Sequence, residues 1–377
     1  MSKQLDYNTD TVKHFVRYNG WLEPFRGIKN YVNRELRAKR RDTRCRYLTF
    51  CAAQAVDVFM LEHGRYLYRD QETNRLKDVY FIENDEESFS IITKMIGSAS
   101  QGFFGDFQSI ILQPDIPDNE DAMDEPETEA EREALRLRDL KKSLLGIFPF
   151  DVINLDMYGN FFPKSEQRYS DSCQVYRQVL TQQRLSGKES CQKFLMFLTI
   201  YTPPSISCIN PDSFSVLQES VYSNLSYQEF RTAFNERFSH VEPDKIEFYL
   251  LFLIGFVKRI IFKEGYEAGW EPSIKDIFCY DRTKPSSEEA YKMSTIVVEY
   301  KRNDSLLVQD FSGAIPQVVK NDYLEQLVEI LASKPNHVPS EGAIPAEVVE
   351  NLGEVIKFRN DFLRNIGIYN PNQFGVL

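Results

Sequence analysis

Three apolar runs in this chain are each followed closely by an acidic residue and a turn. The runs cover residues 79–82, 103–104 and 152–155, and the acids that follow them are Glu83, Asp106 and Asp156. The third run is apolar enough to be covered on both faces, as the strands of a parallel sheet are. Ligands of open α/β sheets bind outside the carboxyl ends of the strands, so the sequence predicts a functional site along that edge.

Strand-like and helical segments alternate along most of the chain. A strand over 46–51, small residues over 52–55 and a helix over 56–62 are typical of the start of a βαβ unit. Later strands are expected over 193–201, 274–280 and 295–300, and the last two, joined by the polar loop 281–289 without a crossover helix, should pair antiparallel. Helices are expected over 9–46, 86–96, 129–145, 174–183, 246–263, 322–334 and 346–366, whereas 109–112 fits a strand or a helix.

The predicted fold class is therefore α/β, a doubly wound and mostly parallel seven-stranded sheet with helical additions at both ends. We expect a helical extension over 1–45, a Rossmann-like domain over 46–302 and a helical cap over 303–377. Residues 114–133 hold ten acidic residues and three prolines, so we expect a solvated insertion between strands there.

Composition narrows the class of protein. The 377 residues are 42% hydrophobic, enough for a sizeable core, and the net charge of −11 argues against coating nucleic acid by charge alone. Six cysteines without a CxxC pair and four histidines without ligand spacing predict neither a disulfide framework nor a metal site. The most apolar run, 248–262, contains Lys258 and Arg259, and no N-terminal signal pattern is seen. We therefore expect a cytoplasmic protein with no membrane partner.

The order of strands and strand-end acids over 46–302 resembles the class I S-adenosylmethionine-dependent methyltransferases. The strands over 79–82 and 152–156 are similar to those of bacterial proteins associated with restriction and phage-defence methyltransferases. The resemblance implies S-adenosylmethionine as cofactor. It also implies roles for strand-end residues: Ala52, Ala53 and Asp57 in the first loop, Glu83 for the ribose hydroxyls, Asp106 with Phe107 for the adenine, and Asn154, Asp156 and Tyr158 facing the substrate.

The chain departs from the family pattern in three places. The first loop has alanines and a glutamine where the family has glycines, so no position with φ > 0 comes without strain. Glu83 follows that loop at a longer distance than the roughly 20 residues expected, which makes 64–77 an insertion and a candidate hairpin. The substrate corner, Asp156 to Tyr158, lacks the two prolines of amino-group methyltransferases.

A basic run precedes the first strand, interrupted by Glu35 and Asp42. Its candidate nucleic-acid-binding residues are Arg37, Lys39, Arg40, Arg41 and Arg44. These side chains could bind the phosphates of a nucleic acid. Equally, they could form a helix face that pairs with the acidic insertion.

Three functions remain open from sequence. The first is a methyltransferase-like protein acting on nucleic acid in a bacterial defence or restriction-type system. The second is a catalytically inactive Rossmann scaffold that binds a partner protein or senses a nucleotide in a defence complex. In either case we expect the protein to be an oligomer or a subunit of a complex, with nucleic acid or other defence proteins as partners. The third, ranked last, is a nuclease using Glu299 and Lys301 on a late strand.

Overall fold

The computed structural model of the chain describes residues 11–35, 45–51, 53–114, 128–157, 161, 170–186, 191–203, 209, 211–238, 248–283, 290–304, 317–333 and 335–374. It forms two compact units. Unit 1 comprises Met1–Asn154 and Pro339–Leu377, and unit 2 comprises Leu155–Val338. Residues 46–302, predicted as one domain, contribute to both units.

Unit 1 is built on parallel strands. They are β1 (Tyr47–Thr49), β4 (Val79–Glu83), β5 (Gly102–Phe104) and β6 (Val152–Met157), which begins in unit 1 and ends in unit 2. Their order is β6-β1-β4-β5, and β1 pairs parallel with both β4 and β6, as β4 does with β5. The prediction of parallel strands at 46–51, 79–82, 103–104 and 152–156 is therefore confirmed, with small changes in their bounds, and β1 is buried on both faces.

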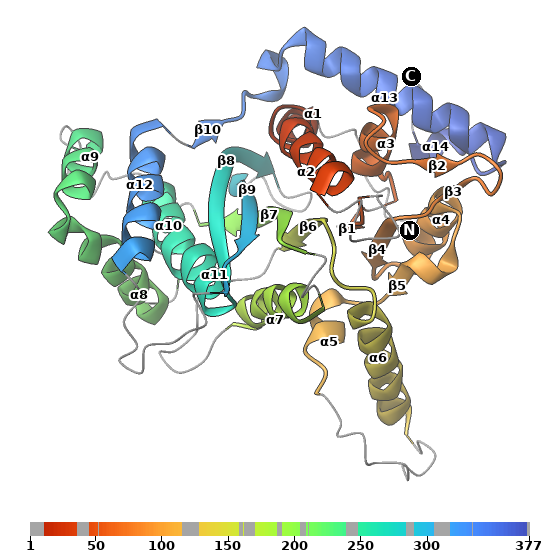
Figure 1. Cartoon of the computed structure of the whole chain (residues 1–377). Helices are drawn as coiled ribbons and strands as arrows, with labels where there is room; N and C mark the ends of the chain where they lie inside the picture. The colour runs from red at the N-terminus through yellow and green to blue at the C-terminus, as the bar shows by residue number, and fades with distance from the viewer. Residues whose placement is uncertain are drawn as a thin grey trace. The chain divides into compact units, whose positions relative to one another are not determined.

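Helices separate these strands in sequence, as the alternation predicts. Those of unit 1 are α1 (Thr11–Val16), η1 (Arg17–Trp21, π-helical), α2 (Leu22–Glu35), α3 (Val56–His63), α4 (Glu86–Ile96), η2 (Ala99–Gln101), α5 (Phe107–Ile111), α6 (Glu129–Leu145), η8 (Glu341–Ala343), α13 (Ala346–Asn365) and α14 (Pro371–Phe374). Figure 1 shows α13 beside α3 and α1, and these helices pack against one another.

Local sequence signals account for several of these bounds. Asp85 caps α4 by accepting a hydrogen bond from the Ser88 amide, and Gly97 ends the helix with φ of 84°. Thr128 and Glu131 form a capping box at the start of α6. The insertion 64–77 contains an antiparallel hairpin of β2 (Arg69–Asp70) and β3 (Arg75–Leu76), as predicted. Residues 109–112, left open between strand and helix, belong mostly to α5.

Unit 2 combines a mostly antiparallel set of strands with helices. Its strands are β7 (Lys193–Thr202), β8 (Trp270–Thr283), β9 (Ala290–Arg302) and β10 (Asn336–His337), in the order β10-β8-β9-β7. β9 pairs antiparallel with both β7 and β8, which confirms the predicted pairing of the last two strands. The helices are α7 (Asp171–Ser186), α8 (Pro211–Tyr222), η4 (Ser223–Ser226), α9 (Gln228–Phe238), α10 (Phe248–Phe256), η6 (Val257–Phe262, π-helical), α11 (Lys263–Glu267) and α12 (Gln317–Ser333).

The α/β class is thus correct, but the seven-stranded type is not confirmed. Leaving aside the hairpin β2-β3, the described residues contain eight strands, because β10 follows α12 and pairs parallel with β8. The helices α8 and α9 were also not predicted. None of the helices in the described part of the chain is both long and apolar enough to cross a membrane.

Candidate functional site

The predicted acids of unit 1 lie at the ends of neighbouring strands. Glu83, the last residue of β4, is in register with Phe104, the last residue of β5. The Gly105 amide donates a hydrogen bond to the Glu83 carbonyl oxygen at 3.0 Å, so the turn leading to Asp106 is fixed against the end of β4. Glu83 and Asp106 therefore share the carboxyl edge of the parallel strands, as their sequence positions predict.

Glu83 uses one carboxylate oxygen to shape its own turn. Its Oε1 accepts hydrogen bonds from the backbone amides of Asn84 at 2.8 Å and Asp85 at 2.9 Å. Within the described ranges, Oε2 has no hydrogen-bond partner. Burial raises the pKa of this half-buried carboxyl group above its usual value, and the two amides partly oppose the shift. One acceptor of Glu83 thus remains for a ligand hydroxyl.

Asp106 caps the short helix α5. Its Oδ2 accepts hydrogen bonds from both the amide and the hydroxyl of Ser109, each at 2.8 Å. The next residue, Phe107, is only 5% exposed and packs edge to face against Phe50, with ring centroids 5.0 Å apart. Phe107 therefore joins α5 to the end of β1 as part of the core.

The loop between β1 and α3 is buried and locally strained. Ala53, Gln54 and Ala55 are all less than 10% exposed. Ala55, the residue before α3, has φ of 43° and ψ of 34°, in the left-handed region. An L-residue other than glycine adopts this conformation at a cost of about 1–2 kcal/mol. The alanine thus takes the conformation that a glycine would adopt without strain, and such strain is found most often at functional loops.

Asp57 links this loop to the strands through a buried hydrogen-bond network. Its Oδ2 accepts from the Tyr47 hydroxyl at 2.8 Å and from the Thr49 hydroxyl at 2.7 Å. The Asn154 amide nitrogen donates to the Thr49 hydroxyl at 3.1 Å. The structure therefore joins Asp57 and Asn154, predicted for the cofactor and the substrate respectively, through Thr49. Because Asp57 is 1% exposed, its carboxylate serves to hold β1 and α3 together.

The end of β1 also brings the two carboxylates of Asp57 and Glu83 near one thiol. Burial is the main cause that raises the pKa of Cys51 well above its usual value, and the charges of Asp57 and Glu83 raise it further. Cys51 is thus a protonated, unreactive thiol at pH 7. The described cysteines, residues 45, 51, 173, 191 and 279, are all free and buried.

Arg359, which the sequence analysis did not single out, holds the loop between β1 and α3 in place. Arg359 of α13 is fully buried and donates through Nη1 to the Gln54 carbonyl oxygen at 3.4 Å and to the Gln54 side-chain oxygen. Its Nε and Nη2 donate to the Asn360 side-chain oxygen at 3.1 and 2.9 Å. Nη2 also donates to the Phe374 carbonyl oxygen at 2.8 Å. Arg359 therefore joins the β1–α3 loop, α13 and α14.

The environment of Arg359 is unusual for a buried cation. In the part of the chain that the structure describes, its hydrogen-bond acceptors are neutral oxygens, with no carboxylate among them. Burial lowers the pKa of the guanidinium to about 10, which still leaves it charged at pH 7. The buried position of this arginine could have been predicted from the sequence. Leu352, Val355, Arg359 and Leu363 have helical spacing, so the arginine lies on the apolar face of the predicted helix.

Several predicted site residues lie outside the described residues. They are Ala52, Tyr158, Arg37, Lys39, Arg40, Arg41 and Arg44. Asp156 is described and is half-buried near the end of β6, where the chain has entered unit 2. Of the predicted set, the structure of unit 1 thus places Ala53, Asp57, Glu83, Asp106, Phe107 and Asn154.

Glu299, one of the two residues proposed for a nuclease, takes part in ion pairs within the sheet. Glu299 lies between two lysines of neighbouring strands, 3.4 Å from the Lys193 ammonium and 3.3 Å from that of Lys275. Its charge is therefore compensated within the sheet. Among the described residues, no group of three or more histidine, cysteine, aspartate or glutamate side chains could hold a metal ion.

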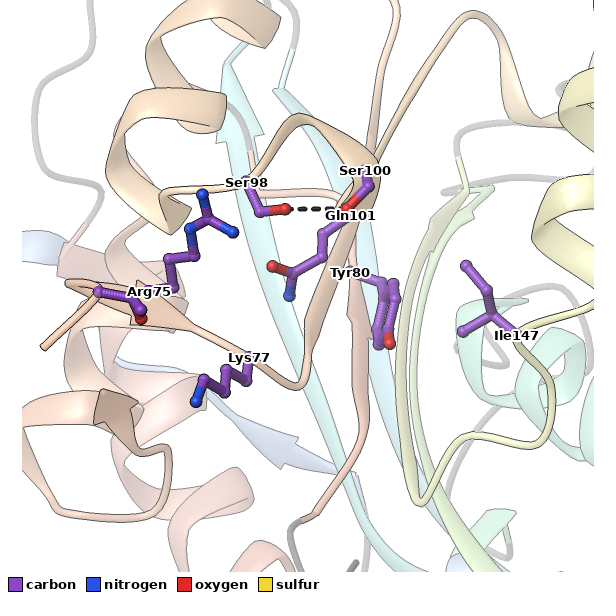
Figure 2. A pocket seen from close by; sticks show the side chains of 8 residues that line it. Arg75, Lys77, Tyr80, Ser98, Ser100, Gln101 and Ile147 are labelled. Atoms are coloured by element: carbon purple, nitrogen blue, oxygen red, sulfur yellow. Dashed lines mark hydrogen bonds between the residues drawn. The ribbon is translucent and has the colours of Figure 1, made fainter. Parts of the chain in front are cut away.

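A polar pocket of about 390 Å³ lies at the opposite, amino ends of the strands of unit 1. Figure 2 shows Arg75 and Lys77 on one side of it and Tyr80 and Ile147 on the other. Because Lys77 precedes β4 and Ile147 precedes β6, the pocket lies at the edge of the sheet where these strands begin. The sequence analysis did not predict this pocket.

Two hydroxyls complete that pocket: Ser98 and Ser100 are hydrogen-bonded at 2.9 Å, as the dashed line in Figure 2 shows. The side-chain Nε2 of Gln101 donates hydrogen bonds to the Leu76 and Val79 carbonyl oxygens, each at 2.7 Å, so it holds β3 to β4.

Comparisons of the chain with protein-family models, with curated proteins and with solved structures find no match.

Proposed function

We propose that unit 1 binds S-adenosylmethionine at the carboxyl edge of β1, β4 and β5 and acts as a methyltransferase. One observation carries the proposal. The parallel strands follow the order β6-β1-β4-β5, and Glu83 and Asp106 end up side by side at the edge where nucleotide ligands of such sheets bind. The resemblance of the sequence to class I methyltransferases points to the same edge.

The donor and acceptor groups at this edge are of the kind that the cofactor requires. Oε2 of Glu83 is an acceptor suited to a ribose hydroxyl, and Asp106 engages only Oδ2 in the described residues, which leaves Oδ1 for an adenine amino group. S-adenosylmethionine supplies an electrophilic methyl group when bound. Methyl transfer by in-line attack then depends mainly on positioning, so the protein needs little acid–base chemistry.

We further propose that the methyl acceptor is a nitrogen of a nucleic-acid base. Support comes from the sequence, in which Arg37, Lys39, Arg40, Arg41 and Arg44 directly precede β1. Cations so close in sequence to the cofactor loop would hold phosphates near it. Asn154, Asp156 and Tyr158 are the residues proposed to face the acceptor. The bacterial defence or restriction setting stays a prediction from the resemblance.

An inactive scaffold is the second candidate, and the packing of Arg359 favours it. The guanidinium binds both the backbone and the side chain of Gln54, and Ala53 and Ala55 are almost fully buried. A loop closed in this way by α13 offers less access to the amino-acid end of a cofactor than the glycine-rich loop of the resembled family. In this reading the same strands bind a partner protein or a nucleotide without catalysis.

The test is a thermal titration of the full chain with S-adenosylhomocysteine. At a hundred times its dissociation constant, the ligand should stabilise the protein by about 2.7 kcal/mol, which raises the melting temperature by several degrees. Glu83→Ala should weaken binding about tenfold or more, because it removes the acceptor of a charge-assisted hydrogen bond. Glu86→Ala, three residues further on and exposed, is the matched control and should bind as the wild type does.

Two results would contradict the proposal. The absence of any shift in the wild type at millimolar ligand would favour the scaffold. A shift that Glu83→Ala retains in full would place the ligand elsewhere.

A further inference from the structure

A second pocket, in unit 2, lies beside the π-helical segment η6. It has a volume of about 140 Å³ and is lined by Lys258, Arg259, Phe262, Lys263, Tyr266 and Tyr323, among others. The volume is several times what one water needs and below that of a typical drug-sized site. It therefore suits a ligand of about one ring and one small polar group.

The π-helix helps to explain why cations gather at this place. Backbone hydrogen bonds of a π-helix run from residue i to residue i+5, so side chains five positions apart, like those four positions apart, lie on the same side of the helix. Lys258 and Lys263 have this separation, and Arg259 precedes Lys263 by four positions. Short π-helical segments inside α-helices often occur at functional sites.

Among the described residues, the basic side chains at the pocket outnumber the acidic side chains close to them. Lys258 donates hydrogen bonds to two neutral oxygens, Ser223 Oγ at 2.8 Å and Asn224 Oδ1 at 2.7 Å, and its burial lowers its pKa to about 8. Arg259 has neither a hydrogen-bond partner nor an ion-pair partner among the residues that the structure describes. Lys263 reaches the carboxylate of Glu267 at 3.6 Å.

Two acidic side chains near the pocket, Glu264 and Glu267, also form ion pairs with Arg177. Glu264 is 1% exposed and lies 2.8 Å from the Arg177 guanidinium, which is also 3.3 Å from Glu267. Glu219 is close enough to Lys258 to raise its pKa slightly against the effect of burial. Against these acids stand Lys258, Arg259, Lys263 and Arg177. Lys258 and Arg259 are therefore the cations that a ligand anion would best complement.

Aromatic rings form the other wall of the pocket. Phe262, Tyr266 and Tyr323 are each less than 10% exposed. The ring of Phe262 is 5.9 Å from that of Tyr266 and 5.9 Å from that of Tyr323, measured between centroids. The pocket thus combines apolar ring surface with cationic groups, which is the composition of a site for an organic anion.

We propose that this pocket binds a small aromatic anion, with its phosphate or carboxylate group at Arg259 and Lys258 and its ring against Phe262, Tyr266 and Tyr323. The proposal concerns unit 2 alone. It stands independently of cofactor binding in unit 1.

The test is calorimetric titration of the full chain with phenyl phosphate and with benzoate, which separates the two anion sources. At least one of them should bind, and more tightly than phenol or inorganic phosphate, each of which carries only half of the recognised chemistry. Arg259→Gln should weaken that binding at least tenfold. Lys275→Gln, which removes an exposed lysine of β8 outside the pocket, is the matched control and should leave binding unchanged.

The proposal is overturned if neither anion binds at millimolar concentration, or if Arg259→Gln binds as well as the wild type. Arg259 has no partner to lose among the described residues, so this variant should fold, and its melting curve checks that expectation. Lys263→Gln removes a second cation of the same pocket and replaces Arg259→Gln as the test if that variant does not fold.

Discussion

Arg359→Ala is expected to lower the free energy of unfolding by about 3–5 kcal/mol, because truncation removes the guanidinium donor of several buried acceptors and opens a cavity. The acceptors are the carbonyl oxygens of Gln54 and Phe374 and the side-chain oxygens of Gln54 and Asn360. The loss should appear in urea unfolding as a lower midpoint. Since the guanidinium joins α13 to the β1–α3 loop, unit 1 should be the part that unfolds first.

Arg364→Ala is the matched control in the same helix. Its guanidinium pairs with Asp361 at 2.7 Å, and both side chains are more than half exposed, so the expected loss is under about 1 kcal/mol. Equal and small losses in the two variants would show that Arg359 does not hold the loop.

His14 is expected to make the protein markedly less stable in acid. The ring is fully buried, and burial together with the charge of Arg17 lowers its pKa from 6.5 to about 4. Below pH 6.5 the unfolded chain binds a proton that the folded protein rejects, so stability falls as the pH decreases, until the folded state titrates near pH 4. A shift of this size corresponds to a loss of about 3 kcal/mol across that range.

The measurement is the free energy of unfolding between pH 7 and pH 4 for the wild type and His14→Gln. The glutamine can keep a hydrogen bond to Asn351, which the histidine ring contacts at 3.1 Å, but it cannot take up a proton. Carboxyl groups that titrate in the same range contribute equally to both proteins, so the difference reports His14.

His63→Gln removes an exposed ring that lies 5.4 Å from that of Phe358, and it should keep the acid sensitivity of the wild type. Identical pH profiles for the wild type and His14→Gln would refute the assignment.

Elements with local signals were predictable from the sequence. The apolar run of β4, the capping Asp85 and the terminating Gly97 lie within twenty residues and specify a strand followed by a helix. The hairpin of β2 and β3 followed from the unusual length of the segment before Glu83. Strand β10 has only two residues, too few for any periodic pattern, and its pairing with β8 raises the strand number to eight.

The site was predictable only to the level of strand ends. Glu83 and Asp106 could be placed because the end of a parallel strand fixes the edge at which the next residue lies. The partners of Asp57 depend on which side of α3 faces β1, and the contact of Arg359 with Gln54 joins residues 305 positions apart. Contacts of this kind depend on tertiary packing, which a single sequence does not display.

The most direct test of the central claim is amide hydrogen exchange of the full chain with and without saturating S-adenosylhomocysteine. If the cofactor binds at the carboxyl edge of unit 1, exchange should slow in peptides that cover residues 50–57, 83–88 and 104–109, while β8 and β9 of unit 2 stay unchanged. Unchanged exchange in all three unit 1 segments, or protection confined to unit 2, would contradict the account.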